Sequence, residues 1–473
     1  MLMAAPEVSE VSAVAGAGGI VTVTYTLSGA PAIVTFDVLE GETSIGERNL
    51  WYSDGAVCRK VVTDGEHTFT WDARKSWPNA NASVKVKVTA WDPGDPPDII
   101  VADLCDSNSN VWYYASTNAM PGGLLENKYY RTSAIVLKRI RAKGVAWTMG
   151  DDPALDPGAV TPSSNGYAEP HEVTLTNDFY MGVFELTQAQ ERRGDRTADT
   201  SFFTSDFAMR PTENRQGYQL VGSGTTHPSN PVSSNGWLAW MRNYTGLEGL
   251  YYPGEAQWEF AARGGHGHGY WGDGTKMASD DPAADPGLAA RYGCDAATTD
   301  GAVRADAGGT AIVGSYPPNG YGLYDMAGNV REMTVDLFQS YADIPDEERA
   351  VGAINNVDGY TLDGKTKPQY SIFRGGGWCD SAKECHPGYR WHGYANGNNK
   401  YSGFRISMNI GDPAADYTGP SSAPSSVFAI NTAETASHEG AAGALEARGN
   451  SLYESLGIDL ITKALRGLIL FVR

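Results

Sequence analysis

The sequence has few charged residues, and basic residues are the scarcer kind. Charged side chains make up 19% of the 473 residues, against about a quarter in typical globular domains. Lys and Arg number 36 against 56 Asp and Glu, a formal net charge of −20. Phosphate binding requires clustered Lys and Arg, so this balance predicts no nucleic-acid partner.

Long apolar runs are also missing, so we expect no transmembrane segment. The first residues, MLMAAPEVSEV, lack the basic region and the apolar stretch of a signal peptide. The Ala4-Ala5-Pro6 sequence resembles what remains after a signal has been trimmed. We therefore expect a secreted or cell-envelope protein whose signal peptide is absent from this chain.

Cysteine is sparse, and an odd count excludes complete pairing within one chain. The five cysteines are Cys58, Cys105, Cys294, Cys379 and Cys385. Of these, Cys379 and Cys385 are close enough in sequence to bridge, to share a metal or to remain thiols.

Glycine and tryptophan are plentiful, with 56 and 12 residues, which favours a loop-rich α+β protein over a regular helical bundle. Residues 8–100 alternate apolar and polar side chains, a period typical of half-buried strands. This part resembles an immunoglobulin-like β-sandwich. Residues 101–143 are predicted as a connector with a strand at Ala134–Ile140. Residues 411–473 form a predicted flexible tail with either a short amphipathic helix or disordered chain at its end.

Between these parts, residues 144–410 form the predicted main domain. Helices are expected near Thr187 and after Pro253. Four stretches stand out: Asp178-Phe-Tyr-Met-Gly-Val-Phe-Glu-Leu-Thr-Gln188, Tyr252-Pro-Gly-Glu-Ala-Gln-Trp-Glu-Phe-Ala-Ala-Arg-Gly-Gly265, Asn319-Gly-Tyr-Gly-Leu-Tyr-Asp-Met-Ala-Gly-Asn-Val-Arg-Glu332 and Phe373-Arg-Gly-Gly-Gly-Trp378. In this order, they resemble the formylglycine-generating enzyme (sulfatase-modifying factor) family. The resemblance implies an irregular, C-type-lectin-like α+β fold.

The family's oxidase members bind Cu(I) through two cysteines and convert a sulfatase cysteine to formylglycine with O2. Their cysteines stand two and seven residues after the tryptophan of an Arg-Gly-Gly-Ser-Trp motif. Here Cys385 matches the second position, but Cys379 falls one residue early and Asp380 occupies the first position. A slip of one residue in extended chain turns a side chain to the opposite face. The motif's serine is replaced by Gly377. The resemblance therefore leaves Cys379 and Cys385 as candidate catalytic copper ligands with an altered spacing.

The resemblance also implies a structural Ca2+ site in the third stretch. Carried over to this sequence, its ligands are the side chains of Asp325 and Glu332 and the carbonyls of Gly328 and Val330. Hard oxygen ligands close together on an irregular loop suit Ca2+. The alternative for this stretch is a hydrogen-bonded turn stabilised by Asn329.

The stretch after Tyr389-Arg390 has the composition of a recognition surface, in which rigid aromatics supply contact area and Asn supplies adaptable hydrogen bonds. The candidate ligand-binding residues are Trp391, His392, Tyr394, Asn396, Asn398, Asn399 and Tyr401. The alternative for this stretch is a polar loop whose tyrosines pack on the domain.

Two functions follow as hypotheses. One is a catalytically silent secreted or envelope protein that binds a protein or glycan ligand. The other is a copper-dependent formylglycine-generating oxidase.

Overall fold

The protein is described by a computed structural model. The described residues are 5–45, 52–76, 84–105, 111–151, 169–194, 201–204, 207–215, 220–222, 232, 234–266, 290, 309–352, 361–362, 365–366, 370–394 and 399–410. The predicted flexible tail, 411–473, lies outside them.

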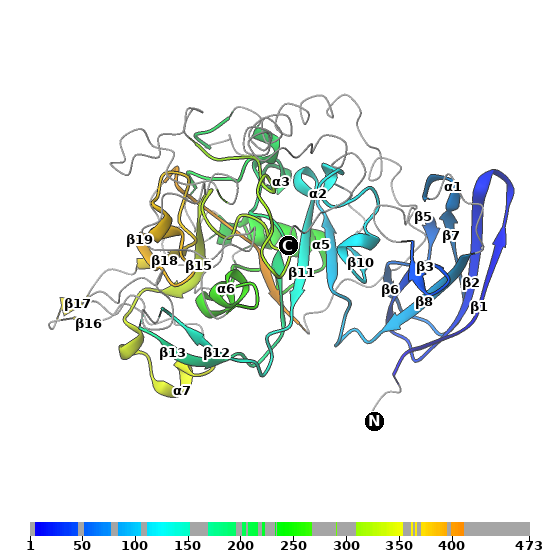
Figure 1. Cartoon of the computed structure of the whole chain (residues 1–473), viewed down its shortest axis with the longest axis horizontal. Coiled ribbons are helices and arrows are strands. Elements are labelled where there is room, and N and C mark those ends of the chain that lie inside the picture. Colours follow the sequence, from blue (N-terminus) through cyan, green and yellow to red (C-terminus); the bar gives the residue numbers. More distant parts are fainter. Residues whose placement is uncertain are drawn as a thin grey trace, which may run out of the picture. The chain divides into compact units, whose positions relative to one another are not determined.

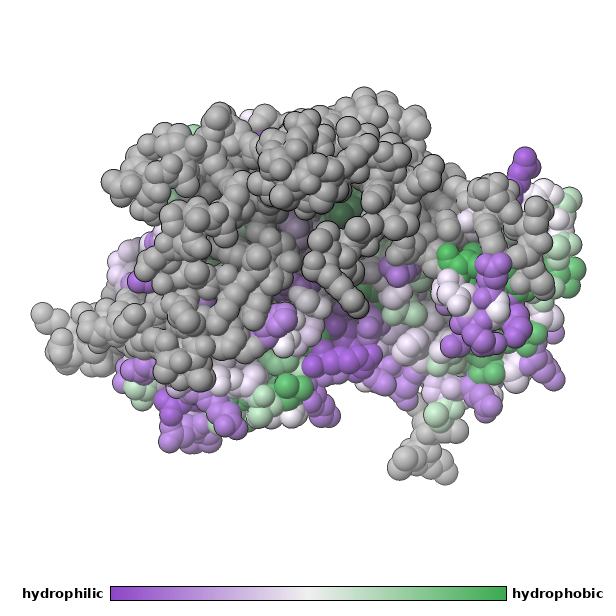
Figure 2. All heavy atoms as spheres, viewed as in Figure 1, coloured by the Kyte–Doolittle hydropathy of each residue, from purple (hydrophilic) through white to green (hydrophobic). Residues whose placement is uncertain are grey.

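Two antiparallel sheets form an N-terminal all-β module, which confirms the predicted β content of this part. One sheet has the order β1-β2-β7-β5, with β1 at Glu7–Ala15, β2 at Ile20–Ser28, β5 at Tyr52–Gly55 and β7 at Gly65–Asp72. In the other, β3 (Ala32–Glu40) pairs with β4 (Thr43–Ser44), β6 (Arg59–Val61) and β8 (Val84–Trp91). Along β2, Val23, Tyr25 and Leu27 are at most 1% exposed, as a period of two requires. Figure 2 shows hydrophilic and apolar residues interspersed on the visible face of these strands.

A five-stranded sheet forms the centre of the main domain, with the order β10-β9-β11-β14-β21. Its strands are β9 (Ile99–Asp103), β10 (Val111–Tyr114), β11 (Ala134–Ile140), β14 (Phe179–Gly182) and β21 (Ser407–Asn409). The strand predicted at Ala134–Ile140 is confirmed as β11, which pairs with β9 on one side and β14 on the other. The stretch 101–143, predicted as a connector, thus contributes to this sheet.

A second sheet holds the ends of the third and fourth sequence stretches, with the order β19-β18-β15-β20. Figure 1 shows β19, β18 and β15 of this sheet. Its strands are β15 (Arg331–Leu337), β18 (Tyr370–Arg374), β19 (Trp391–Tyr394) and β20 (Ser402–Gly403). Two hairpins complete the described strands: β12 (Ala146–Met149) with β13 (His171–Thr174), and β16 (Thr361–Leu362) with β17 (Lys365–Thr366).

The described helices are short. They are α1 (Ala73–Ser76), α2 (Tyr129–Thr132), α3 (Gln188–Gly194), α5 (Trp237–Thr245), α6 (Glu255–Ala262) and α7 (Asp346–Arg349). The short 3-10 turns are η1 (Ala17–Gly19), η2 (Thr117–Ala119), η3 (Phe207–Met209), η5 (Tyr341–Asp343) and η6 (Ala382–Cys385). The two predicted helices are confirmed as α3 and α6. Together the sheets and helices confirm the predicted α+β class.

The N-terminus of α6 is capped from outside the helix. Its N-cap residue, Gly254, has no side chain for this role. Instead, the carboxylate of Asp336 on β15 accepts a hydrogen bond from the backbone N–H of Glu255 at 2.5 Å. A carboxylate there satisfies an orphan N–H and complements the helix dipole. This contact fixes α6 against the motif-bearing sheet.

Candidate functional site

Strand pairing brings the third and fourth sequence motifs together. In the register of β15 with β18, Glu332 lies opposite Arg374. Strand β20 runs parallel to β15 on its other side, with Gly403 opposite Glu332. Arg374 and Gly403 therefore flank Glu332 on its two sides.

The candidate copper ligands differ in their surroundings. Cys385 is completely buried at the end of η6 and packs near Ala290, Ala327 and Ala382. Desolvation raises the pKa of its thiol well above the ordinary value, which disfavours the thiolate that copper binding needs. Cys379 is partly exposed, and none of the cysteines in the described part of the chain forms a disulfide.

Asp380 stands where the family's first copper-binding cysteine is expected. Its side chain is 5% exposed. The Arg331 guanidinium donates to both carboxylate oxygens, with Nε 2.6 Å from Oδ2. Oδ2 also accepts a hydrogen bond from the backbone N–H of Gly377 at 2.7 Å. The position therefore holds a buried ion pair instead of a thiol.

Gly377, which replaces the serine of the motif, has little room for a side chain. A Cβ atom added at Gly377 would lie 3.0 Å from the carbonyl oxygen of Tyr401 and 3.4 Å from Oδ2 of Asp380. At the neighbouring Gly376, it would lie 2.6 Å from the sulfur of Cys385. Glycine at both positions lets the chain pass close to Asp380 and Cys385.

Three of the four predicted calcium ligands, Asp325, Gly328 and Val330, lie in the loop before β15. The fourth, Glu332, is on β15 and has other partners. Arg405 donates to both of its oxygens, with Nε 3.0 Å from Oε1 and 2.8 Å from Oε2. Trp258 Nε1 donates to Oε2 at 2.6 Å.

Asp325 differs from Glu332, because its Oδ1 is buried without a hydrogen-bond partner. Its Oδ2 accepts from Gly314 N–H at 2.7 Å. Burial raises the pKa of Asp325 to about 6. The orphaned Oδ1 fits a cation, whereas Glu332 would have to share its carboxylate with Arg405. Calcium binding stays a prediction for this loop. In the described part of the chain, no three His, Cys, Asp or Glu side chains are grouped as a metal site.

A buried network of acidic and basic groups around α6 was not predicted. Arg390 pairs bidentately with Glu255, at 2.6 and 2.9 Å. Arg374 donates to Glu259, whose side chain is 0% exposed. Desolvation raises the pKa of Glu255, but Arg390 and Arg374 outweigh it and hold the pKa below the ordinary value. Two glutamates four residues apart in an otherwise apolar helix were the available signal.

The rings of Phe202, Phe203, Trp378 and Tyr401 form a row, and the Arg331 guanidinium joins this row to Trp391. We call the following residues the aromatic strip: Phe202, Phe203, Trp378, Tyr401 and Trp391. Ring centroids lie 5.3 Å apart for Phe203 and Trp378, and 5.7 Å apart for Trp378 and Tyr401. The Arg331 guanidinium lies 3.7 Å from the Trp391 ring centroid and 5.6 Å from that of Tyr401. Phe202, at one end of the strip, is 60% exposed.

The structure places five of the seven predicted ligand-binding residues. Trp391 and Tyr401 belong to the aromatic strip. On β19, Tyr394 is 55% exposed, and the ring of His392 stacks on Phe338 at 4.4 Å. The Oδ1 atom of Asn399 accepts from Tyr401 N–H at 2.8 Å, so this side chain holds the turn. Asn396 and Asn398 lie outside the described residues.

Sequence reasoning missed three contributors to this surface. Phe202, Phe203 and Lys400 join residues of the predicted recognition stretch. The adjacent phenylalanines in a polar stretch were the available signal.

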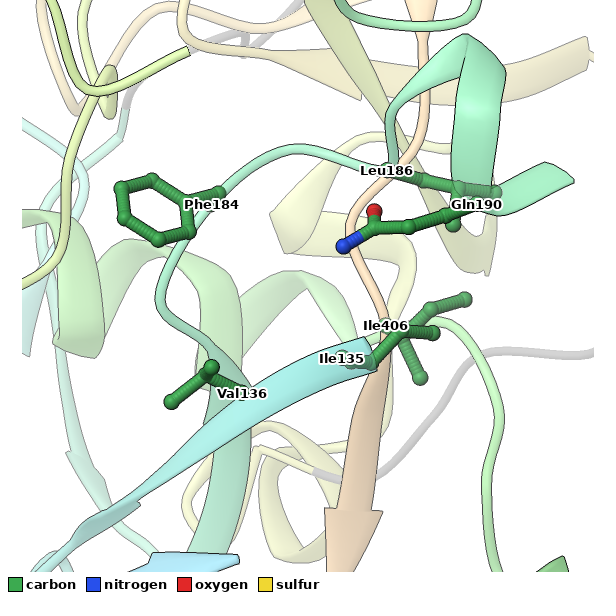
Figure 3. A pocket seen from close by; sticks show the side chains of 6 residues that line it. All are labelled: Ile135, Val136, Phe184, Leu186, Gln190 and Ile406. Carbon is green, nitrogen blue, oxygen red and sulfur yellow. The ribbon is translucent and has the colours of Figure 1, made fainter. Parts of the chain in front are cut away.

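A small pocket beside the central sheet is not a second site. It is lined by Ile135, Val136, Phe184, Leu186, Gln190 and Ile406 (Figure 3). The amide of Gln190 is used by the backbone, because Nε2 donates to Ala134 O at 2.6 Å and Oε1 accepts from Thr187 N–H at 2.9 Å. The remaining lining is apolar and belongs to the packing of the sheet.

A family model described as a sulfatase-modifying factor enzyme 1-like domain matches residues 140–410. The chain therefore belongs to this family, as its motifs predict. No helix within the described ranges is long and apolar enough to cross a membrane.

Particular relatives differ in name. The chaperone protein LppX of Paenibacillus barcinonensis is 27% identical over 279 residues, 55% of this chain and 90% of that protein. The formylglycine-generating enzyme of Mycobacterium tuberculosis is 42% identical over 101 residues, 20% of this chain and 30% of that enzyme. Among solved structures, Treponema denticola variable protein 1 matches with 21% identity and a TM-score of 0.40, over 59% of this chain and 96% of that one.

Proposed function

We propose that this protein is a catalytically silent member of its family that binds a protein or glycan ligand outside the cytoplasm. The observation that carries this proposal is the ion pair between Arg331 and Asp380. It lies where an oxidase of this family would hold its first copper-binding thiolate.

The ion pair disfavours copper chemistry for two physical reasons. Cu(I) prefers soft sulfur ligands, and the carboxylate of Asp380 is a hard oxygen ligand. The carboxylate is also already bound by Arg331 and by Gly377 N–H. Cys385 alone would leave Cu(I) without the second thiolate of the oxidase site. The alternative, a formylglycine-generating oxidase, would need Cys379 to take the place of Asp380.

Ligand binding is supported by the aromatic strip and by Tyr394. Partly exposed rings provide contact area at low cost in side-chain entropy. The Phe202 side chain is 60% exposed and that of Tyr394 is 55% exposed. Their backbones are held by hydrogen bonds, with Phe202 N–H donating to Glu213 at 2.7 Å. Preorganised aromatic groups of this kind are the usual anchors of binding surfaces.

Two measurements test the proposal. The first is a Cu(I) titration of the reduced protein against a chromogenic chelator. We expect no stoichiometric binding of copper. If the wild type binds one equivalent and Cys385→Ser does not, the protein is not catalytically silent and the proposal is overturned.

The second measurement is a screen of glycan and peptide arrays, followed by affinity measurements with Tyr394→Ala and Phe202→Ala. We expect at least one variant to weaken binding about tenfold without loss of folding. Lys383→Ala is the matched control, since this exposed residue of η6 lies outside the aromatic strip. Binding that is unchanged in both aromatic variants would contradict a ligand on this surface.

A further inference from the structure

Lys400 occupies a cage of three aromatic rings. Its Nζ lies 5.0 Å from the ring centroid of Phe202, 5.4 Å from that of Tyr401 and 5.5 Å from that of Trp378. An ammonium within about 6 Å of an aromatic face is attracted by the ring quadrupole. Three rings around one cation form the kind of site that recognises substituted ammonium groups.

The cage is built independently of the lysine side chain. Trp378 Nε1 donates to the backbone carbonyl of Lys400 at 3.1 Å. The backbone N–H groups of Phe202 and Tyr401 donate to Glu213 and Asn399. Each ring is therefore positioned by contacts that remain when the Lys400 side chain is removed.

Among the described residues, the three rings are what holds the Lys400 ammonium. In the described part of the chain, no carboxylate forms an ion pair with it, whereas the neighbouring Arg331 is paired with Asp380. Residue 400 is also partly exposed. A cation–π contact at a partly exposed site is weak, because the ammonium gives up part of its hydration to make the contact. The lysine side chain can therefore leave the cage at low cost.

Charge decides which class of ligand suits the cage. The chain carries a formal net charge of −20, so its field attracts cations and repels anions at long range. An incoming ammonium group gains this attraction together with the three ring faces. An anionic ligand would have only the Lys400 ammonium to oppose the acidic field.

We infer that Phe202, Trp378 and Tyr401 form a binding site for an ammonium group of the ligand, which Lys400 fills until the ligand displaces it. The inference deepens the proposed function and rests on it. The ligand class is a quaternary ammonium group, which is the chemistry that choline presents. Lys400 acts as an internal competitor that lowers the apparent affinity.

Choline is a direct probe, and its neutral isostere 3,3-dimethylbutan-1-ol is the matched ligand. Binding is measured by saturation-transfer NMR and calorimetry on the full chain. In Lys400→Ala the competitor is gone, so we expect choline affinity to rise about three- to tenfold over wild type. The isostere should bind much more weakly in both proteins, because it fills the same volume without charge.

Further variants locate the site. Phe202→Ala and Tyr401→Leu are each combined with Lys400→Ala. Each should lower choline affinity at least about fivefold relative to Lys400→Ala alone. Near-UV circular dichroism checks that both proteins fold. Lys383→Ala is the control for loss of a surface lysine and should match wild type. Equal choline affinity in wild type and Lys400→Ala overturns the inference, and so does equal binding of choline and its isostere.

An anionic probe separates this inference from the proposed function. Glucuronate binding that is lost in Lys400→Ala would overturn the cation site but leave a binding surface in place. Array ligands whose affinity falls in Tyr394→Ala but is unchanged in the cage variants would lead to the same conclusion. Choline binding at the cage without any array ligand would support the inference and contradict the wider proposal.

Discussion

Arg331 and Asp380 form a buried ion pair next to the aromatic strip, with Nε of the arginine 2.6 Å from Oδ2 of the aspartate. The guanidinium carbon of Arg331 also lies over the Trp391 ring, 3.7 Å from its centroid. One side chain thus connects the altered copper position with the proposed ligand surface. The pair fixes the structure of both regions.

Breaking this pair on one side should destabilise the protein. Arg331→Met leaves the buried carboxylate of Asp380 without its partner, so we expect a loss of about 2–4 kcal/mol in the free energy of unfolding. Replacing both residues, Arg331→Met with Asp380→Asn, should cost less. Urea denaturation measures both. Lys85→Met breaks a pair with Glu42 whose side chains are 70% and 88% exposed, and is the control, expected to cost under about 1 kcal/mol. Equal losses at the two sites would contradict the prediction.

Gly376 should tolerate no side chain. Its φ is +67°, and a Cβ atom would lie 2.6 Å from the Cys385 sulfur and 2.9 Å from the Glu384 carbonyl oxygen. We predict that Gly376→Ala costs about 2–4 kcal/mol or abolishes folding. Gly393→Ala is the matched variant, because its Cβ would meet Phe373 at an ordinary 3.6 Å. Thermal melts of the two variants should differ clearly, and a stable Gly376→Ala protein would refute this reading of the motif.

Replacing Arg390, the partner of Glu255, should destabilise the protein by an amount that depends on pH. The pKa of Glu255 is held below its ordinary 4.5 in the folded protein. The stabilisation from its charge is therefore present above about pH 4.5 and lost as pH falls below that value. We expect Arg390→Met to cost about 3–5 kcal/mol at pH 7.

That deficit should narrow below pH 4.5, because a protonated glutamate is less costly to bury without a partner. Urea denaturation of wild type and variant at a series of pH values measures the effect. A deficit that does not change with pH would show that packing of the arginine, and not its charge, is responsible.

Calcium should bind at Asp325 if the loop keeps its family role. We predict that millimolar Ca2+ raises the thermal midpoint of wild type by several degrees, because the buried Oδ1 gains a partner. Asp325→Ala should remove this response. Mg2+ is the control cation, since it demands a more regular shell of ligands. No response in wild type would contradict calcium binding at this loop.

Local patterns were enough to predict much of the fold. The alternation along Val23, Tyr25 and Leu27 predicted a strand, and the apolar stripe after Pro253 predicted α6. The helix α5 was missed, although Trp237, Leu238 and Met241 are buried at helical spacing and Gly246 ends the helix in the left-handed region. Its signal was obscured by the Ser, Asn and Gly residues just before it.

The candidate site was predictable in place but not in chemistry. Sequence spacing located Cys385 and Asp380, yet the arginine that binds Asp380 comes from another strand. Likewise, Phe202 and Phe203 reach Trp378 and Lys400 only through the tertiary fold. Such contacts depend on how sheets pack, and no local propensity specifies them.

The five-stranded sheet has a consequence for anyone who wants to produce the main domain alone. Its order is β10-β9-β11-β14-β21, and β9, β10 and β11 all end at or before Ile140. A shortened protein starting at residue 144 would lack three of its five strands. Strand β14 would then offer an open edge with buried apolar residues to other molecules, a known route to aggregation. A fragment that keeps this sheet must therefore include β9, β10 and β11.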